Sequence, residues 1–368
     1  MTATLSSAQA HRVAVGITPM ETRHDVVLRL AMQAEALGYD AFLLAEGWGH
    51  DAGVLLGAIA ARTRRIRIGT GVLNVWGRSA AGLAMLAGSL DALSGGRFVL
   101  GLGAGSPQLA EGLHDQPFTA PVARLAAVTR QVRALLAGER MTPTRSGPAQ
   151  SGPTQSGPAR SGTVRPLRLA VAPRPDIPLY LAALGPDAVR VTGELADGWF
   201  PFLLPRSGLP DGIERLGAGA AAAGRPRPLV SPGVPVALAE NPATAHAVAC
   251  WWVATYLTGM GPVYPRTLRR LGFDAAVDAV LAANPTPRTT EIPKPARVLL
   301  DELTVWGDAE VGREHLSRWF EAGAELPAVV LPPGRPVAEL EYTLEALAPV
   351  AGEFGRARAT AIRRSVYQ

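Results

Sequence analysis

Reactive side chains are concentrated in one short segment of the chain. Residues 46–51 read Glu-Gly-Trp-Gly-His-Asp, which places two carboxylates, an indole and an imidazole close together. A carboxylate that ends an apolar strand and faces an enclosed mouth can exchange protons with a substrate. We therefore expect Glu46 and His50 to be catalytic. The structural alternative is that Asp51 caps the following helix while Glu46 pairs with an arginine.

Two further segments have the composition of ligand-binding loops. Residues 101–106 read Gly-Leu-Gly-Ala-Gly-Ser, which is neither a dinucleotide fingerprint nor a P-loop, but small residues let a flat ring approach the backbone. Residues 184–187 read Leu-Gly-Pro-Asp and open an expected helix. Free amides at a helix start attract anions, so this segment is a candidate phosphate site. Ordinary helix capping would explain the same residues.

Other chemistries lack the residues that they need. Cys250 is the sole cysteine, so neither an intrachain disulfide nor a thiolate metal cluster can form. The six histidines show no paired ligand spacing, and no Gly-x-Ser-x-Gly nucleophile elbow is present. We expect no bound metal.

Charge and hydropathy exclude two classes of partner. The formal charge is +5, yet no Lys/Arg block interleaved with aromatics occurs, so nucleic acid is not an expected partner. No run of about eighteen uncharged apolar residues could cross a membrane. The first eleven residues lack the apolar core of a signal peptide, so we expect a cytoplasmic protein.

The elements that must position these residues follow a repeating pattern. Short apolar runs alternate with amphipathic stretches, as in successive strand–helix units. The pattern predicts an α/β protein, a (β/α)8 TIM barrel, whose reactive groups lie at the carboxyl ends of the strands. A doubly wound open sheet is the alternative. The expected strands are 12–17, 40–46, 67–73, 98–105, 177–184, 199–204, 230–239 and 328–331.

We expect one barrel domain over residues 12–350, with two interruptions. A Ser-Gly-Pro repeat at 143–165 buries almost nothing and should form a surface loop. A helical insertion at about 242–320 precedes the last strand, and its aromatics Trp251, Trp252 and Tyr256 would either cover the mouth or pack its helices. Residues 1–11 and 351–368 are expected to be a disordered N-terminus and a C-terminal tail.

Several of these segments, taken together and in order, resemble luciferase-like flavin and deazaflavin oxidoreductases. The matching sequences are GYDAFLLAE at 38–46, RIGTGVLN at 67–74, LDALSGGRFVLGLGAG at 90–105, SPQLAEGLHDQPF at 106–118 and IPLYLAALGPDAVRVTGELADG at 177–198. The chain looks most like the deazaflavin (F420) branch represented by methylenetetrahydromethanopterin reductase. One departure is Glu46-Gly47, where several deazaflavin relatives carry Asp-His.

The resemblance implies where a cofactor and substrate would lie. A bulge with a non-prolyl cis peptide at Gly71–Val72 would lie behind the ring, with Asn74 at the ring edge. Gly103, Ala104, Gly105 and Ser106 would flank the ring or its side chain, and Leu184, Gly185, Pro186 and Asp187 would hold the phosphate. The substrate pocket would contain Thr18, Trp48, Trp76, His114 and Phe202.

The resemblance leads to one expected function and two alternatives. The first is a reductase that passes hydride from reduced F420 to an activated C=C, C=N or C=O of a small molecule or of a natural-product or peptide intermediate. The second is an FMN-dependent monooxygenase, which would need a partner enzyme that supplies reduced FMN. The third is a non-catalytic binding protein on a degenerate barrel. A homodimer is compatible with all three.

Overall fold

The computed structural model of the chain describes residues 11–141, 165–286 and 289–348. The predicted N-terminal segment, Ser-Gly-Pro loop and C-terminal tail lie outside these residues, apart from His11 and Arg165 at their edges. Those three predictions therefore stay predictions.

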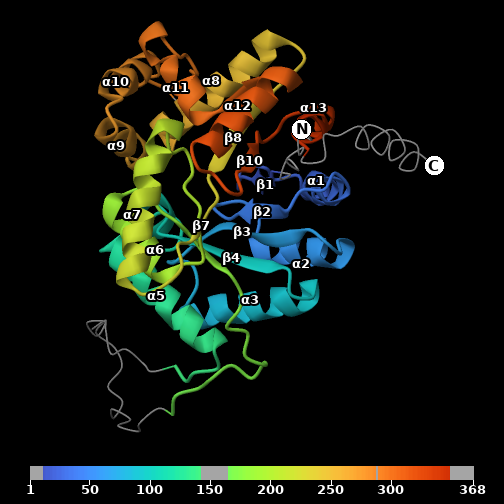
Figure 1. Cartoon of the computed structure of the whole chain (residues 1–368), viewed down its shortest axis with the longest axis vertical. Helices are drawn as coiled ribbons and strands as arrows, with labels where there is room; N and C mark the ends of the chain where they lie inside the picture. Colours follow the sequence, from blue (N-terminus) through green and yellow to red (C-terminus); the bar gives the residue numbers. More distant parts are fainter. Residues whose placement is uncertain (1–10, 142–164, 287–288, 349–368) are drawn as a thin grey trace, which may run out of the picture.

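The described strands form one parallel sheet that curls into a barrel (Figure 1). Its order is β7-β6-β5-β4-β3-β2-β1-β10-β8-β9. A parallel bridge from Phe202 to Gly233 joins the β6 side to β8 and closes the ring. The strands are β1 Ala14–Ile17, β2 Ala41–Ala45, β3 Arg67–Asn74, β4 Phe98–Gly103, β5 Leu179–Ala182, β6 Gly198–Trp199, β7 Leu229–Val230, β8 Gly233–Leu238, β9 Val305–Gly307 and β10 Ala328–Leu331.

Helices surround the sheet, and α8, α9, α10 and α11 gather on one side of it (Figure 1). Two short 3-10 helices, η1 Arg206–Gly208 and η2 Lys294–Ala296, lie among them. The α-helices are α1 His24–Ala36, α2 Ala52–Arg62, α3 Ala80–Ser94, α4 Pro107–Ala110, α5 Pro121–Leu136, α6 Pro186–Leu195, α7 Leu209–Ala222, α8 Pro242–Gly259, α9 Val263–Arg270, α10 Asp274–Ala283, α11 Val298–Leu303, α12 Ala309–Glu321 and α13 Val337–Ala346.

The expected seventh strand, 230–239, is two strands in the structure. β7 pairs with β6, whereas β8 pairs with β10, and Ser231-Pro232 separates them. Pro232 has no N–H to donate to a sheet, which explains a break at this point. The structure also contains β9, which pairs with β8 inside the stretch that we expected to be helical. Its three residues are too few to show a strand periodicity in the sequence.

The inner and outer faces of the strands belong to different clusters of side chains. On β1, Val15 and Ile17 belong to the large core between sheet and helices, whereas Ala14 belongs to a small inner cluster. β2 repeats this alternation, since Phe42 and Leu44 face the helices and Ala41 and Leu43 join the inner cluster. Because neighbouring residues of a strand point to opposite faces, small inward residues leave space inside the ring.

β3 approaches β4 unusually closely around a bulge. The register between them shifts from Gly69↔Val99 to Leu73↔Leu102, which interrupts the ladder. The Thr70 hydroxyl repairs it, because Oγ1 accepts from Gly101 N at 2.7 Å and donates to Gly101 O at 2.9 Å. The prediction of a cis peptide at Gly71–Val72 was wrong, since the described residues contain no cis peptide bond.

This close approach requires glycine at position 101. A Cβ on Gly101 would lie 2.1 Å from Thr70 O, a backbone atom that cannot move aside. We therefore predict that Gly101→Ala lowers the free energy of unfolding by about 1–3 kcal/mol or more. The measurement is thermal or urea denaturation.

Gly57→Ala is the matched control for that variant. Gly57 lies inside α2, and a Cβ there would meet only Leu90 Cδ2 at 4.0 Å. Replacing a helical glycine with alanine should stabilise the protein by roughly 0.5–1 kcal/mol. Equal effects of the two substitutions would contradict the steric argument.

Candidate active site

A cavity of about 930 Å³ opens at the carboxyl ends of the strands. It is bordered by residues at or just after the ends of β1 to β6 and by residues of α8 and α9. Most of the predicted site residues line it: Thr18, Glu46, Trp48, Gly71, Val72, Asn74, Gly103, Ala104, Gly105, Ser106, Leu184, Gly185, Pro186, Asp187 and Phe202. The barrel topology therefore brings together segments that are far apart in the sequence.

Three predicted site residues do not line the cavity. His50 is exposed, and its Nε2 lies 2.8 Å from Thr22 O on the outside of the mouth. Trp76 is buried and donates from Nε1 to Ala104 O at 2.6 Å, which ties the β3 and β4 loops together. His114 lies 3.1 Å from the Asn74 amide nitrogen and so contacts the site through that side chain. The sequence could not show that the His50 and Trp76 rings contact backbone carbonyls or that the His114 ring contacts the Asn74 side-chain amide.

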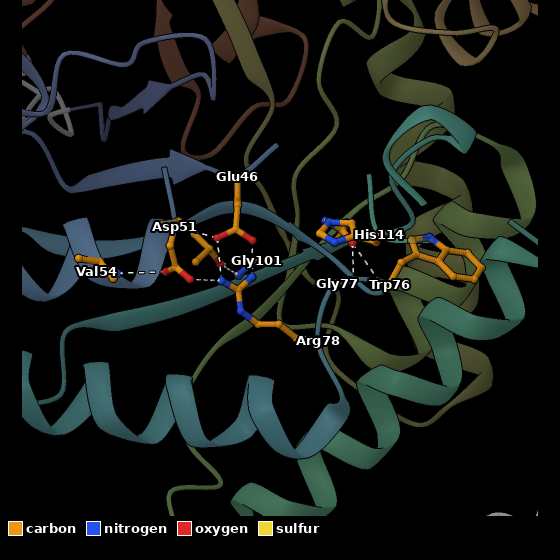
Figure 2. Close-up of polar contacts among 11 residues, drawn as sticks. Glu46, Asp51, Val54, Trp76, Gly77, Arg78, Gly101 and His114 are labelled. Carbon is orange, nitrogen blue, oxygen red and sulfur yellow. Dashed lines mark hydrogen bonds and ion pairs between the residues drawn. The ribbon is translucent and has the colours of Figure 1, made fainter. Parts of the chain in front are cut away.

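Glu46 lies in an ion-pair network at the end of β2 (Figure 2). The Arg78 guanidinium contacts both carboxylate oxygens, with Nη2 at 2.9 Å from Oε2. The same Nη2 lies 2.6 Å from Asp51 Oδ2. Glu46 Oε2 also accepts from Ala52 N at 2.9 Å, at the first turn of α2. One arginine thus joins two carboxylates that the sequence places in the same segment.

This network assigns the segment a structural role. Asp51 caps α2 by accepting from Val54 N at 3.2 Å, and Glu46 pairs with an arginine, as the structural alternative required. The hydrogen bond to Glu46 raises the pKa of the Arg78 guanidinium, so the cation is firmly held. A carboxylate that accepts from a guanidinium and from a backbone amide is held in one orientation by these bonds. This geometry suits a positioning role for Glu46.

Asn74 is fixed by the backbone of its own loop. Its Oδ1 accepts from Trp76 N at 3.0 Å and from Gly77 N at 2.8 Å. These bonds close a turn after β3 and hold the amide against the cavity wall. Gly105, on the facing loop, has φ +65°, a conformation that favours glycine, and a Cβ there would lie 3.3 Å from Asn74 Cβ.

The start of α6 has the features of an anion site. No side chain caps its N-terminus, a Cβ on Gly185 would meet nothing within 4 Å, and residues 185–187 line the cavity. Arg270 of α9 donates from Nη2 to Leu184 O at 2.7 Å and lines the same cavity. Burial and the nearby Arg215 lower the pKa of the Arg270 guanidinium, so an anion beside it would be stabilising.

An aromatic group covers the side of the cavity next to β6 and β8. Phe202 lies 5.1 Å from Tyr256 and 6.3 Å from Tyr264, measured between ring centroids. Tyr256 was among the aromatics that we expected to cover the mouth or to pack helices, and it does both, because it also contacts Trp252. Tyr264 and Arg270 were not expected. They lie on the short helix α9, whose place in the fold no local pattern reveals.

The described residues contain neither a candidate metal site nor a candidate membrane-spanning helix. No group of three or more histidine, cysteine, aspartate or glutamate side chains is placed to hold a metal ion within 11–141, 165–286 and 289–348. None of the helices in this part of the chain is both long enough and apolar enough to span a membrane.

Comparison with known proteins identifies related sequences and folds. The family model described as luciferase-like monooxygenase matches residues 5–326. A putative coenzyme F420-dependent oxidoreductase of Mycobacterium tuberculosis is 33% identical over 327 residues, which cover 84% of this chain and 92% of that protein. A 5,10-methylenetetrahydromethanopterin reductase of Methanolobus tindarius is 30% identical over 208 residues, which cover 55% of this chain and 58% of that protein.

A solved structure supports the barrel. The coenzyme F420-dependent tetrahydromethanopterin reductase of Methanopyrus kandleri superposes with a TM-score of 0.72 at 18% identity, covering 93% of this chain and 99% of that one. At this identity the match concerns the fold, and it confirms the predicted TIM-barrel architecture.

The Glu46–Arg78 pair provides a testable contribution to stability. The Glu46 side chain is 9% exposed, whereas that of Asp51 is 50% exposed. We predict that Glu46→Gln lowers the free energy of unfolding by about 1–3 kcal/mol, because a half-buried guanidinium loses its main partner.

Asp51→Asn is the matched control, since asparagine caps helices about as well as aspartate and an exposed ion pair contributes about 0–1 kcal/mol. Denaturation curves of the two variants give the comparison. A larger loss for Asp51→Asn would show that Asp51, rather than Glu46, is the principal partner of Arg78.

Proposed function

Because the chain belongs to the luciferase-like monooxygenase family, we propose that it is an F420-dependent reductase. In this proposal a reduced deazaflavin supplies hydride to an activated C=C, C=N or C=O of a small molecule or of a natural-product or peptide intermediate. The observation that carries the proposal is the similarity to the Mycobacterium tuberculosis protein described as a putative F420-dependent oxidoreductase. The match covers 92% of that protein. The relative from Methanolobus tindarius is described as a reductase, which fits the proposed direction of the reaction.

The residues around the cavity fit such a cofactor. Thr18 Oγ1 is buried and has no hydrogen-bond partner among the described residues, although it lines the cavity. A buried hydroxyl of this kind needs a ligand or a water molecule. The open amides of α6 and the Arg270 guanidinium would hold a phosphate, and the bulge at Gly71–Val72 would support a ring from behind.

Glu46 and Asn74 would act as positioning residues. Each is held by several hydrogen bonds at the ends of β2 and β3, so neither can reorient without breaking them. Fixed polar groups of this kind orient a bound ring and exclude water from its edge. The predicted catalytic role of His50 gains no support from its position outside the cavity.

FMN-dependent oxygenation is the second candidate, because the matching family is described as a monooxygenase family. It would require a partner enzyme that delivers reduced FMN. The same cavity and phosphate site would serve either cofactor, so binding measurements separate the two candidates.

We predict that the full chain binds F420 with micromolar or tighter affinity, and FMN at least about tenfold more weakly. Quenching of deazaflavin fluorescence and visible difference spectra with FMN measure the two affinities. Tight FMN binding with no response to F420 would overturn the proposed cofactor.

The phosphate site has its own test. We predict that Arg270→Gln weakens F420 binding by roughly 10- to 100-fold, since a hydrogen bond to a charged group contributes about 1.5–3 kcal/mol. Increasing salt should weaken binding to the wild-type protein more than binding to this variant.

Arg269→Gln is the matched control. Arg269 precedes Arg270 on α9, but its guanidinium pairs with Asp278 at 2.7 Å and does not line the cavity. If both variants lose F420 affinity equally, α9 acts only through its overall positive charge. That result would overturn the proposal that Arg270 and the start of α6 hold the phosphate.

A further inference from the structure

Tyr256 and Tyr264 have hydroxyl groups without a hydrogen-bond partner among the described residues. Both side chains line the cavity, Tyr256 from α8 and Tyr264 from α9, with ring centroids 5.5 Å apart. Tyr256 is 6% exposed. Within the described part of the chain neither hydroxyl forms a hydrogen bond, whereas Tyr39 donates to Leu344 O at 2.8 Å. An enclosed hydroxyl without a protein partner is available to a ligand.

The place of these hydroxyls in the barrel also points toward a substrate. The bulge proposed to support the cofactor ring belongs to β3, the third strand of the ring. Tyr256 lies on α8, which follows β8, part of the seventh strand position. Strands four positions apart in an eight-strand barrel face one another across its mouth. A substrate lying between the ring and this wall would present its polar atoms to the two hydroxyls.

Aromatic rings pack against the pair, while Arg266 and Thr267 of α9 line the same cavity. Phe202 and Trp252 pack against Tyr256, and Phe202 also contacts Tyr264. Burial raises the pKa of both phenols, so both remain protonated at neutral pH. On the opposite side, Glu46 is committed to Arg78 and to the amide of Ala52. The two phenol hydroxyls are therefore donors in the cavity wall that no described residue engages.

We propose that Tyr256 and Tyr264 bind the oxygen of a carbonyl substrate and that Tyr256 protonates it. This inference rests on the proposed function and gives its substrate class as a ketone or a conjugated carbonyl compound. A carbonyl oxygen accepts two hydrogen bonds, which matches a pair of donors in a dry, aromatic setting.

The proposed reaction transfers one hydride and one proton to the substrate. In a ketone, hydride would add to the carbonyl carbon, and the C=O π pair would move to oxygen. In a conjugated carbonyl compound, hydride would add to the β carbon, and the conjugated π pairs would shift so that the charge again falls on oxygen. That oxygen takes the proton of the Tyr256 hydroxyl, while Tyr264 donates a hydrogen bond to it. The enol that protonation then gives would tautomerise to the saturated ketone in water. Tyr256 is left as a phenolate and regains its proton from solvent water. The reductant is the reduced deazaflavin of the proposed function, which loses the hydride.

A binding experiment tests the pair without catalysis. 4-Nitrophenol serves as the probe, because its phenolate resembles the developing oxyanion and absorbs visible light. Titration of the full chain at neutral pH should show phenolate binding and a lower phenol–phenolate midpoint for the bound probe. Tyr256→Phe and Tyr264→Phe should each weaken phenolate binding by roughly 10-fold or more and return the midpoint toward that of free probe.

Tyr342→Phe is the matched control. Its hydroxyl accepts from Ala309 N at 3.2 Å and lies outside the cavity, so phenolate affinity should stay within about twofold. Thermal denaturation establishes that all three variants are folded. Absence of phenolate binding to the wild-type chain, or unchanged affinity in both cavity variants, would overturn the inference.

A second readout separates this inference from the proposed function. Reduced F420 and cyclohex-2-enone provide a turnover assay, in which Tyr256→Phe should lower kcat by about 10²–10⁴-fold while the F420 dissociation constant stays within about twofold. Normal F420 binding with unchanged phenolate affinity in the variants would remove the tyrosines and leave the reductase proposal intact. Phenolate binding that depends on the tyrosines, without F420 binding, would support the tyrosine oxygen site and overturn the reductase proposal.

Discussion

The site depends on the small size of the side chains that face inward at the upper ends of the strands. A β/α barrel is normally filled there by branched residues. In this chain the cavity wall is formed at these positions by Gly16, Ala45, Gly71, Gly103 and Ala182. Two of them have a second constraint, because Cβ atoms on Gly71 and Gly103 would lie 2.9 Å from Ala45 N and 2.5 Å from Val72 Cγ1. The glycines that suggested a cofactor loop therefore also permit the close packing of β2, β3 and β4.

The sequence predicted the parts of the fold that repeat and missed those that occur once. Alternating apolar and amphipathic stretches located the barrel strands, because each unit buries one face of a strand and one face of a helix. Pro232 marks the 230–239 strand as irregular, but its division into two strands was not predicted, since it depends on which neighbour each half pairs with. β9 was missed because a three-residue edge strand is defined by its pairing with β8.

The candidate site shows the same limit. The rule that strand ends converge on one mouth selected Glu46, Asn74 and Gly185, and all three line the cavity. It could not assign their partners: Arg78 is 32 residues from Glu46 in sequence, and Arg270 is 86 residues from Leu184. Side chains with several possible roles, such as His50 and Asp51, were assigned only when the structure showed which backbone groups they contact.

The two sides of the mouth differ in how their polar groups are satisfied, and this difference governs what each can do. On the β2 and β3 side, Glu46 pairs with Arg78, and the Asn74 side chain accepts from two backbone amides. These bonds hold the polar groups of that wall in fixed positions. On the opposite side, the Tyr256 and Tyr264 hydroxyls lie among aromatic rings and form no hydrogen bond with the described residues. A paired wall fixes the geometry of whatever rests against it, whereas an unpaired donor in a dry environment interacts strongly with any acceptor that enters. Positioning on one side and proton donation on the other are thus separate tasks of separate elements.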